Sequence, residues 1–172
     1  PSTDSSTTEQ KFTYQGGVMY QFDNGLTPYV SYSTAFVPVQ QISVTGSPLK
    51  PITSRQYEVG LKYEPIGWDT AMTLSVYDLR KEDDTYLDST TNTYRQVGES
   101  RAKGAEVEIN SNLTPNLNVT AAYTYTDARI TKDTVGSLVE GRQMTGVPRN
   151  QASIWGKYLS LIHISEPTRH AQ

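Results

Sequence analysis

The order of short and long connections between extended segments constrains this chain more than any other feature of its sequence. The expected short turns lie at 23–25, 65–68 and 114–116, and the expected long connections at 38–53, 81–95 and 128–149. In an outer-membrane barrel the short turns all face the periplasm and the long loops all face outside. A soluble sandwich mixes the two lengths, because Greek-key crossings join its strands. Strict alternation therefore predicts an all-β fold, an antiparallel transmembrane β-barrel segment.

The segments between these connections carry apolar residues at every second position, which is the period of a β-strand. Phe12–Phe22 is the first of them, and Asn24-Gly25 then gives a strong signal for a tight hairpin. We expect about seven strands of about 10–13 residues, long enough for a tilted membrane crossing. At Tyr77-Asp78-Leu79 the apolar phase becomes unclear, and a β-bulge is expected there.

Composition agrees with a barrel and excludes several other classes. Hydrophobic residues make up 35% of the chain, and no run approaches the roughly 20 apolar residues of a membrane helix. A barrel needs no such run, because every second strand residue faces a polar lumen. The absence of cysteine excludes disulfides, thiolate metal sites and a cysteine nucleophile. A net charge of -3 gives no basic footprint for nucleic acid.

Acidic residues on the expected strands have a functional and a structural interpretation. Four of them are Glu58, Glu64, Glu106 and Glu108. They could form pairs of acids for catalysis, but at alternate strand positions they more simply face a hydrated lumen. The run Glu82-Asp83-Asp84 could bind a cation, although a solvated loop tip is the simpler expectation.

Cations and aromatic residues give the candidates for ligand binding. Three cations cluster around the start of the strand expected at 96–110, namely Arg95, Arg101 and Lys103. They could attract an anionic ligand, and pairing with lumen carboxylates on neighbouring strands is the simpler expectation. Tyr86, Tyr94 and Trp155 could stack on a ligand or belong to an aromatic girdle at the membrane interface. No phosphate-binding loop and no Ser/His/Asp arrangement is present, so no enzyme is expected.

With these segments in place, the chain resembles the barrel of a TonB-dependent ferric-siderophore receptor. Four stretches carry the resemblance, at 20–38 (YQFDNGLTPYVSYS, then FVP), 56–63 (QYEVGLKY), 98–108 (with GAEVE) and 146–152 (GVPRNQA). They occur in the order of the family and together span about residues 10–158. The pattern is closest to receptors for hydroxamate-type siderophores.

This resemblance implies about seven strands of a 22-stranded barrel in the outer membrane of a Gram-negative bacterium. It implies uptake of a ferric siderophore, with energy from the TonB complex through an N-terminal plug that this chain does not include. The siderophore is then a transported ligand and not a cofactor, no metal site is expected, and the other partner is outer-membrane lipid. External loops would capture the ligand, and Tyr86, Tyr94 and Arg142 are the expected contact residues.

Two alternatives stay open, a passive channel or adhesin-like barrel and a soluble carbohydrate-binding β-sandwich. A plug-coding region upstream would favour the receptor over the channel. Residues 1–158 are expected to be the partial barrel, with 1–11 as the remnant of an external loop. Residues 159–172 are expected to be a non-native tail, because Ser160–Arg169 resembles a translated sequencing adapter. His163 and His170 therefore receive no functional role.

Overall fold

The computed structural model describes residues 11–39, 50–88, 93–96, 98–133 and 139–159. The expected loop remnant at 1–11 and the expected tail at 159–172 therefore lie outside the described residues, except for Lys11 and Leu159. Seven strands form one antiparallel sheet in the order β1-β2-β3-β4-β7-β8-β9, as expected from the sequence, and β5 pairs with β6 alone. The sheet strands are β1 (Gln15–Met19), β2 (Leu26–Val37), β3 (Ile52–Tyr63), β4 (Thr70–Glu82), β7 (Glu99–Thr114), β8 (Leu117–Lys132) and β9 (Asn150–Tyr158). The separate hairpin contains β5 (Thr85–Asp88) and β6 (Thr93–Gln96).

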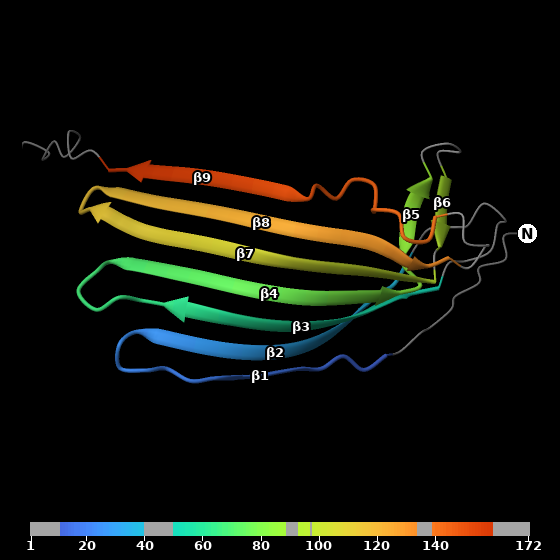
Figure 1. Cartoon of the computed structure of the whole chain (residues 1–172), viewed down its shortest axis with the longest axis horizontal. Helices are drawn as coiled ribbons and strands as arrows, with labels where there is room; N and C mark the ends of the chain where they lie inside the picture. Colours follow the sequence, from blue (N-terminus) through green and yellow to red (C-terminus); the bar gives the residue numbers. More distant parts are fainter. Residues whose placement is uncertain (1–10, 40–49, 89–92, 97, 134–138, 160–172) are drawn as a thin grey trace, which may run out of the picture.

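The tight turns and the long connections lie at opposite ends of the sheet, as Figure 1 shows. In the turn between β1 and β2, Gly25 has a φ of 87° and donates a hydrogen bond from its N–H to the carbonyl of Phe22, at 3.1 Å. Asn24 accepts a hydrogen bond from the N–H of Leu26 at 3.1 Å. Gly67 supplies a second left-handed residue, with a φ of 80°, between β3 and β4. The predicted alternation of connection lengths is thus confirmed.

The outer and inner faces of the sheet differ in polarity along most of its length. One cross-strand row is Val18, Val30, Val59, Val76, Ala105 and Tyr125. The neighbouring row on the opposite face is Tyr29, Gly60, Ser75, Glu106, Thr124 and Gln151. Val59 and Val76 are 54% and 53% exposed, which a soluble protein rarely tolerates across a whole sheet face. The apolar face is suited to lipid, and the polar face to a hydrated lumen.

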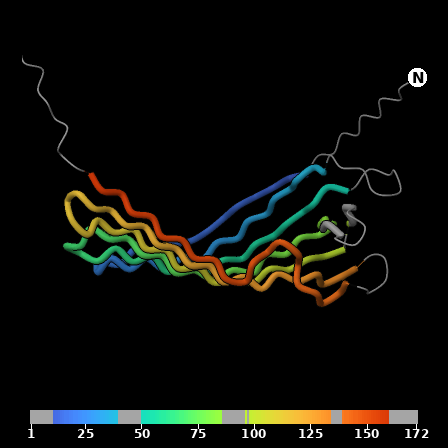
Figure 2. The backbone as a smooth tube through the Cα atoms, turned by 90° about the horizontal axis from the view of Figure 1, so that it is seen from above, coloured from blue at the N-terminus to red at the C-terminus, as the bar shows by residue number. Residues whose placement is uncertain are grey.

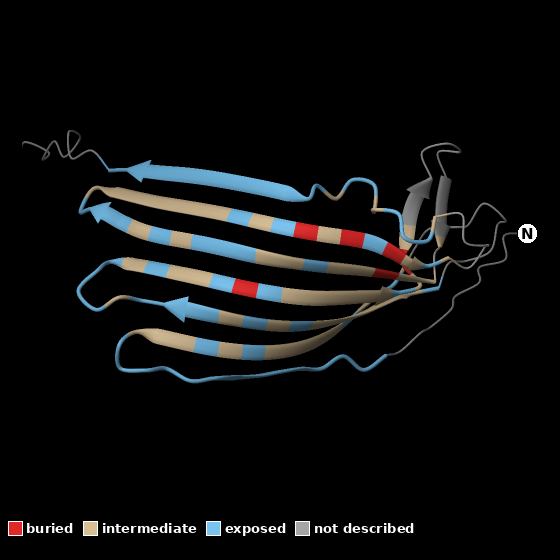
Figure 3. Cartoon of the chain, in the orientation of Figure 1, coloured by how far each residue is buried: buried red, intermediate tan, exposed pale blue. Residues whose placement is uncertain are grey.

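This polarity inverts toward the long connections. Four arginines occupy one cross-strand row of the lipid-facing side, Arg55, Arg80, Arg101 and Arg129. On the lumen side of the same region, Ala128 and Ile130 are 2% and 3% exposed. Figure 3 shows most buried strand positions gathered on β7 and β8 at this end. The sheet therefore leaves the apolar membrane region before its strands end.

The inversion explains why the expected β-bulge at Tyr77-Asp78-Leu79 is wrong. The ladders of β4 with β3 and with β7 run through these residues without a register shift. The apolar phase fails there because Asp78 lies on the outer face and Leu79 on the inner face, where the two faces exchange polarity. The observed irregularities lie between Glu99 and Ser100 and between Asn112 and Thr114. Figure 2 shows the twist that lets β1 and β2 diverge from β8 at the long-connection end.

In the described ranges, no helix is both long and apolar enough to span a membrane.

Candidate functional site

The candidate site is the end of the sheet where the long connections meet, and the β5–β6 hairpin is its most prominent part. Tyr86 lies on β5 opposite Arg95, and Tyr94 lies on β6 opposite Leu87. Figure 1 shows this hairpin at the end with the long connections, running across the direction of the sheet strands. The sequence predicts only a long connection at 81–95, and the hairpin within it was not predicted. Thr and Tyr at 85–86 and again at 93–94 favour strands, and these pairs are the signal that could have revealed it.

The third expected contact residue, Arg142, lies on a different connection. It is exposed and follows Gly141, whose φ is 78°. The carbonyl of Arg142 accepts a hydrogen bond from the N–H of Ile130 at 3.1 Å, which fixes this turn against β8. The structure thus places the three predicted residues on two separate connections at the same end of the sheet.

The chain before β9 continues the ladder on β8. The N–H of Met144 donates to the carbonyl of Ala128 at 2.9 Å, and the N–H of Thr126 donates to the carbonyl of Arg149 at 2.8 Å. Arg129 and Gln143 form an isolated bridge between these two contacts. Residues 141–149 are therefore attached to the sheet at both ends of the segment.

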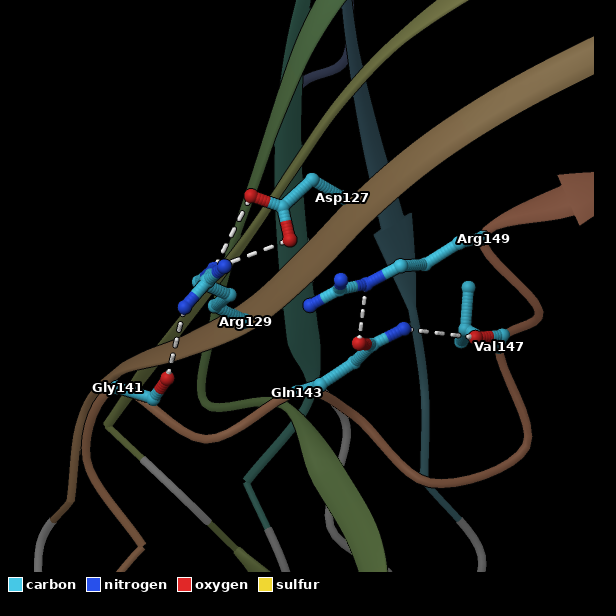
Figure 4. A network of polar contacts seen from close by, with 6 residues as sticks. All are labelled: Asp127, Arg129, Gly141, Gln143, Val147 and Arg149. Atoms are coloured by element: carbon cyan, nitrogen blue, oxygen red, sulfur yellow. Dashed lines mark hydrogen bonds and ion pairs between the residues drawn. The ribbon is translucent and has the colours of Figure 1, made fainter.

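Side chains add a polar network to this attachment, which Figure 4 shows from close by. The Nε of Arg129 donates to both carboxylate oxygens of Asp127, each at 3.0 Å. Gln143 accepts from the Nε of Arg149 at 2.6 Å and donates to the carbonyl of Val147 at 3.3 Å. Charge-assisted hydrogen bonds of this kind are stronger than neutral ones, so the segment has a defined shape on the external side.

Between this segment and the sheet lies a small hollow on the lumen side. Its lining is largely apolar, with a few polar groups: Tyr77, Leu79, Lys81, Ser100, Ala102, Thr126, Ala128, Met144 and Val147. The hydroxyls of Tyr77 and Thr126 form a hydrogen bond at 2.8 Å across β7. Apolar concavities with a few polar groups are typical of small-molecule sites, so this hollow can accept an apolar part of a ligand.

The lumen wall nearer the tight turns carries the acidic residues that the sequence singled out. Both carboxylate oxygens of Glu58 accept hydrogen bonds, from the Tyr29 hydroxyl at 2.7 Å and from the Gln56 amide at 3.1 Å. Glu106 and Glu108 occupy the same face on β7, as expected for a polar lumen. Within the described residues, no group of three or more His, Asp or Glu side chains is placed to hold a metal ion.

Three expectations about individual side chains are wrong. Asp84 is not at a solvated loop tip, since it is 3% exposed and accepts hydrogen bonds from the Ser100 hydroxyl and the Thr85 N–H. Arg101 does pair with a neighbouring strand, but its partner is Asp78 on the outer face. Trp155 is not a lipid-facing girdle residue, because its register partner Thr120 belongs to the polar face.

An antiparallel sheet with a lipid-suited face, a polar face, tight turns at one end and structured connections at the other is the wall of a membrane β-barrel. The chain belongs to the TonB dependent receptor-like, beta-barrel family, which it matches over residues 1–167. Proteins of this family are outer-membrane β-barrels of Gram-negative bacteria, and the seven strands are part of such a barrel.

Individual relatives agree with this assignment. The chain is 40% identical over 151 residues to the ferrichrome outer membrane transporter/phage receptor of Escherichia coli, covering 87% of this chain and 20% of the relative. It is 39% identical over 144 residues to the ferrioxamine B receptor of Salmonella typhimurium, covering 84% of this chain and 20% of the relative. Among solved structures, the siderophore receptor PiuA from Acinetobacter baumannii matches with a TM-score of 0.67 and 27% identity. The match covers 85% of this chain and 23% of PiuA. The chain thus spans about a fifth of the length of these curated relatives.

Proposed function

We propose that this chain forms part of the wall and external mouth of a receptor that imports a ferric siderophore of the hydroxamate type. The observation that carries the proposal is the 40% identity to the ferrichrome transporter over 151 residues, which is 87% of this chain. The external hairpin and the hollow beside Met144 and Val147 are consistent with ligand capture at the mouth. Binding and release suffice for this function, so no covalent chemistry and no cofactor is assigned, and the iron is cargo.

In this proposal the polar face lines the lumen and meets a plug, through which the TonB complex supplies energy. Ligand contact is assigned to Tyr86, Tyr94 and Arg142 because they lie on connections at the external end. Lipid contacts the apolar rows of the opposite face. A passive channel would share the lipid-facing rows, but it would need neither TonB nor a ligand.

A hybrid receptor tests the proposal. Residues 11–159 replace the matched region of the ferrichrome transporter of Escherichia coli, and the hybrid is expressed in a strain that lacks its own ferrichrome transporter. We expect uptake of radioactive iron supplied as ferrichrome or ferrioxamine B, and we expect uptake to stop in a host without TonB. The amount of hybrid in the outer membrane is measured in each strain.

The outcomes separate the alternatives. A hybrid present at the level of the parent transporter that imports neither chelate contradicts the siderophore function. Passage of small solutes without TonB would instead indicate a passive channel. Substitution of Tyr86, Tyr94 and Arg142 by alanine, one at a time, then shows which residue contributes to ligand affinity.

A further inference from the structure

The β5–β6 hairpin is attached to the barrel by a compact set of polar contacts that the proposed function does not use. We call this set the hairpin anchor, formed by the side chains of Asp84, Gln96 and Ser100 and the backbone of Asp83. It lies where β4 ends and where β7 begins. Of the expected ligand residues, Tyr86 closely follows Asp84 along the chain, and Tyr94 closely precedes Gln96.

The amide of Gln96 joins two different external connections. Its Nε2 donates to the carbonyl of Lys50 at 2.8 Å and to the carbonyl of Asp83 at 2.7 Å. Its Oε1 accepts from the N–H of Lys50 at 3.2 Å. Lys50 belongs to the connection before β3, and Asp83 to the connection after β4. One side chain thus holds the bases of both connections through their backbone, independently of the side chains that those connections carry.

Asp84 forms the second half of the hairpin anchor. It is 3% exposed, and its two oxygens accept separate hydrogen bonds, one from the Ser100 hydroxyl and one from the N–H of Thr85 at 2.9 Å. Ser100 is itself 2% exposed and lies in β7 of the main sheet. A buried carboxylate is costly unless such bonds satisfy it, and the bond from Ser100 attaches the start of β5 to β7.

The backbone between these two contacts has an unusual conformation. Asp83 has a φ of 55°, in the left-handed region that non-glycine residues seldom adopt. Its N–H donates to the carbonyl of Gly98 at 3.1 Å, just beyond the end of the ladder between β4 and β7 at Glu82 and Glu99. The change of direction therefore occurs at Asp83, and the contacts of Gln96 and Asp84 on either side of it hold that conformation.

We propose that Gln96 and Asp84 are positioning residues that fix the direction of the β5–β6 hairpin and so set the affinity of the external mouth for its ligand. This rests on the proposed siderophore function. A hairpin held in one direction loses less conformational entropy when a ligand binds than one that must be ordered by the ligand. Neither residue needs to touch the ligand for this effect.

The test uses the hybrid receptor in a form otherwise free of cysteine, since this chain contains none. Spin labels are placed at Leu87→Cys in β5 and Val37→Cys at the end of β2, and their distance distribution is measured by pulsed electron paramagnetic resonance. Ferrichrome affinity is measured in parallel on the unlabelled protein. The variants are Gln96→Leu, which removes the side-chain hydrogen bonds to Lys50 and Asp83, and Asp84→Asn, which weakens the contact with Ser100 and Thr85.

We expect Gln96→Leu to broaden the distance distribution and to weaken ferrichrome binding about tenfold, the size expected for the loss of a few partly buried hydrogen bonds. Asp84→Asn should also broaden the distance distribution and weaken ferrichrome binding, each to a smaller extent. Gln143→Leu is the matched control for the distance, because Gln143 makes the same kinds of contact on the other connection. It should leave the distance between β5 and β2 unchanged.

Each result has a defined meaning. A narrow distribution in Gln96→Leu overturns the hairpin anchor, and a broad distribution with unchanged affinity overturns its role in binding. If Gln96→Leu fails to reach the outer membrane, Gln96→Glu, which retains the acceptor and loses both donated bonds, replaces it in the same comparison. Failure of the unsubstituted hybrid to bind ferrichrome or ferrioxamine B would contradict the proposed function, whereas the distance measurement would still judge the anchor.

Discussion

The two ends of the same strands have opposite polarity. Toward the tight turns, the outer face consists of rows such as Val59 and Val76, and the inner face carries Glu106 and other polar groups. Toward the long connections, the outer face carries a row of arginines, and the inner face buries Ala128 and Ile130. A β-strand permits this exchange because its two faces are independent sets of residues.

This exchange of polarity marks where the surroundings of the sheet change. In hydrocarbon an outward charge is costly and an apolar side chain is not. Above the hydrocarbon, charged side chains are favoured on the outer face and apolar side chains are not. There, residues 139–149 can fold over the inner face and cover its apolar side chains. The boundary on β4 therefore lies between Val76 and Asp78, which are consecutive outward positions.

The boundary does not follow a single cross-strand row. On β2 the outward positions Tyr32 and Phe36 remain uncharged, whereas β3 acquires its first outward charge at Arg55 and β8 at Asp127. Asp127 is one row nearer to the tight turns than Arg129, the residue that shares the arginine row. Barrel strands are tilted against the membrane normal, so a level membrane surface must cross successive strands at different register positions.

A charge in the middle of the apolar rows should have the largest effect. Leu74→Arg places a guanidinium on the outer face between two further apolar outward positions, Met72 and Val76. We expect the complete receptor to lose about 2–4 kcal/mol of folding free energy, measured by denaturant unfolding of the hybrid in lipid vesicles. Thr73→Arg is the matched control, because Thr73 faces the lumen opposite Glu108. Equal losses for the two variants would contradict the assignment of the faces.

A smaller effect should follow from filling a glycine on the inner face. A Cβ on Gly104 would meet the Tyr77 hydroxyl and the backbone carbonyl of Tyr125, so Gly104→Ala must displace the ring that bonds Thr126. We expect a loss of about 1–3 kcal/mol, typical of overpacking, in the same unfolding measurement. Gly156→Ala is the control, since its Cβ meets nothing within 4 Å. An unchanged denaturant midpoint of unfolding for Gly104→Ala would show that the Tyr77 ring moves aside without cost.

Much of the fold could be predicted from the sequence because period and turn chemistry are local. Asn24-Gly25 and the alternation of apolar residues predict the strands around them without knowledge of distant partners. The position of Asp78 could not be predicted in this way, because its environment depends on Arg101 in a strand beyond an intervening hairpin. The burial of Asp84 depends on Ser100 for the same reason. A run of charged residues in the sequence shows only that charges are present. The strand register decides on which face each charge lies and which residue it pairs with.

The smallest effect should come from the ion pair at the external margin. Arg101 contacts both carboxylate oxygens of Asp78, and the two side chains are each 30% exposed. Because water screens such pairs, we expect Asp78→Asn to cost about 0.2–1 kcal/mol at low salt and less at high salt. The combined variant Asp78→Asn with Arg101→Gln should cost less than the sum of the two single variants, because the contact can be lost only once. A cost of several kcal/mol that salt does not reduce would place this pair in the hydrocarbon, and the boundary on β4 would then have to lie beyond Asp78 toward the long connections.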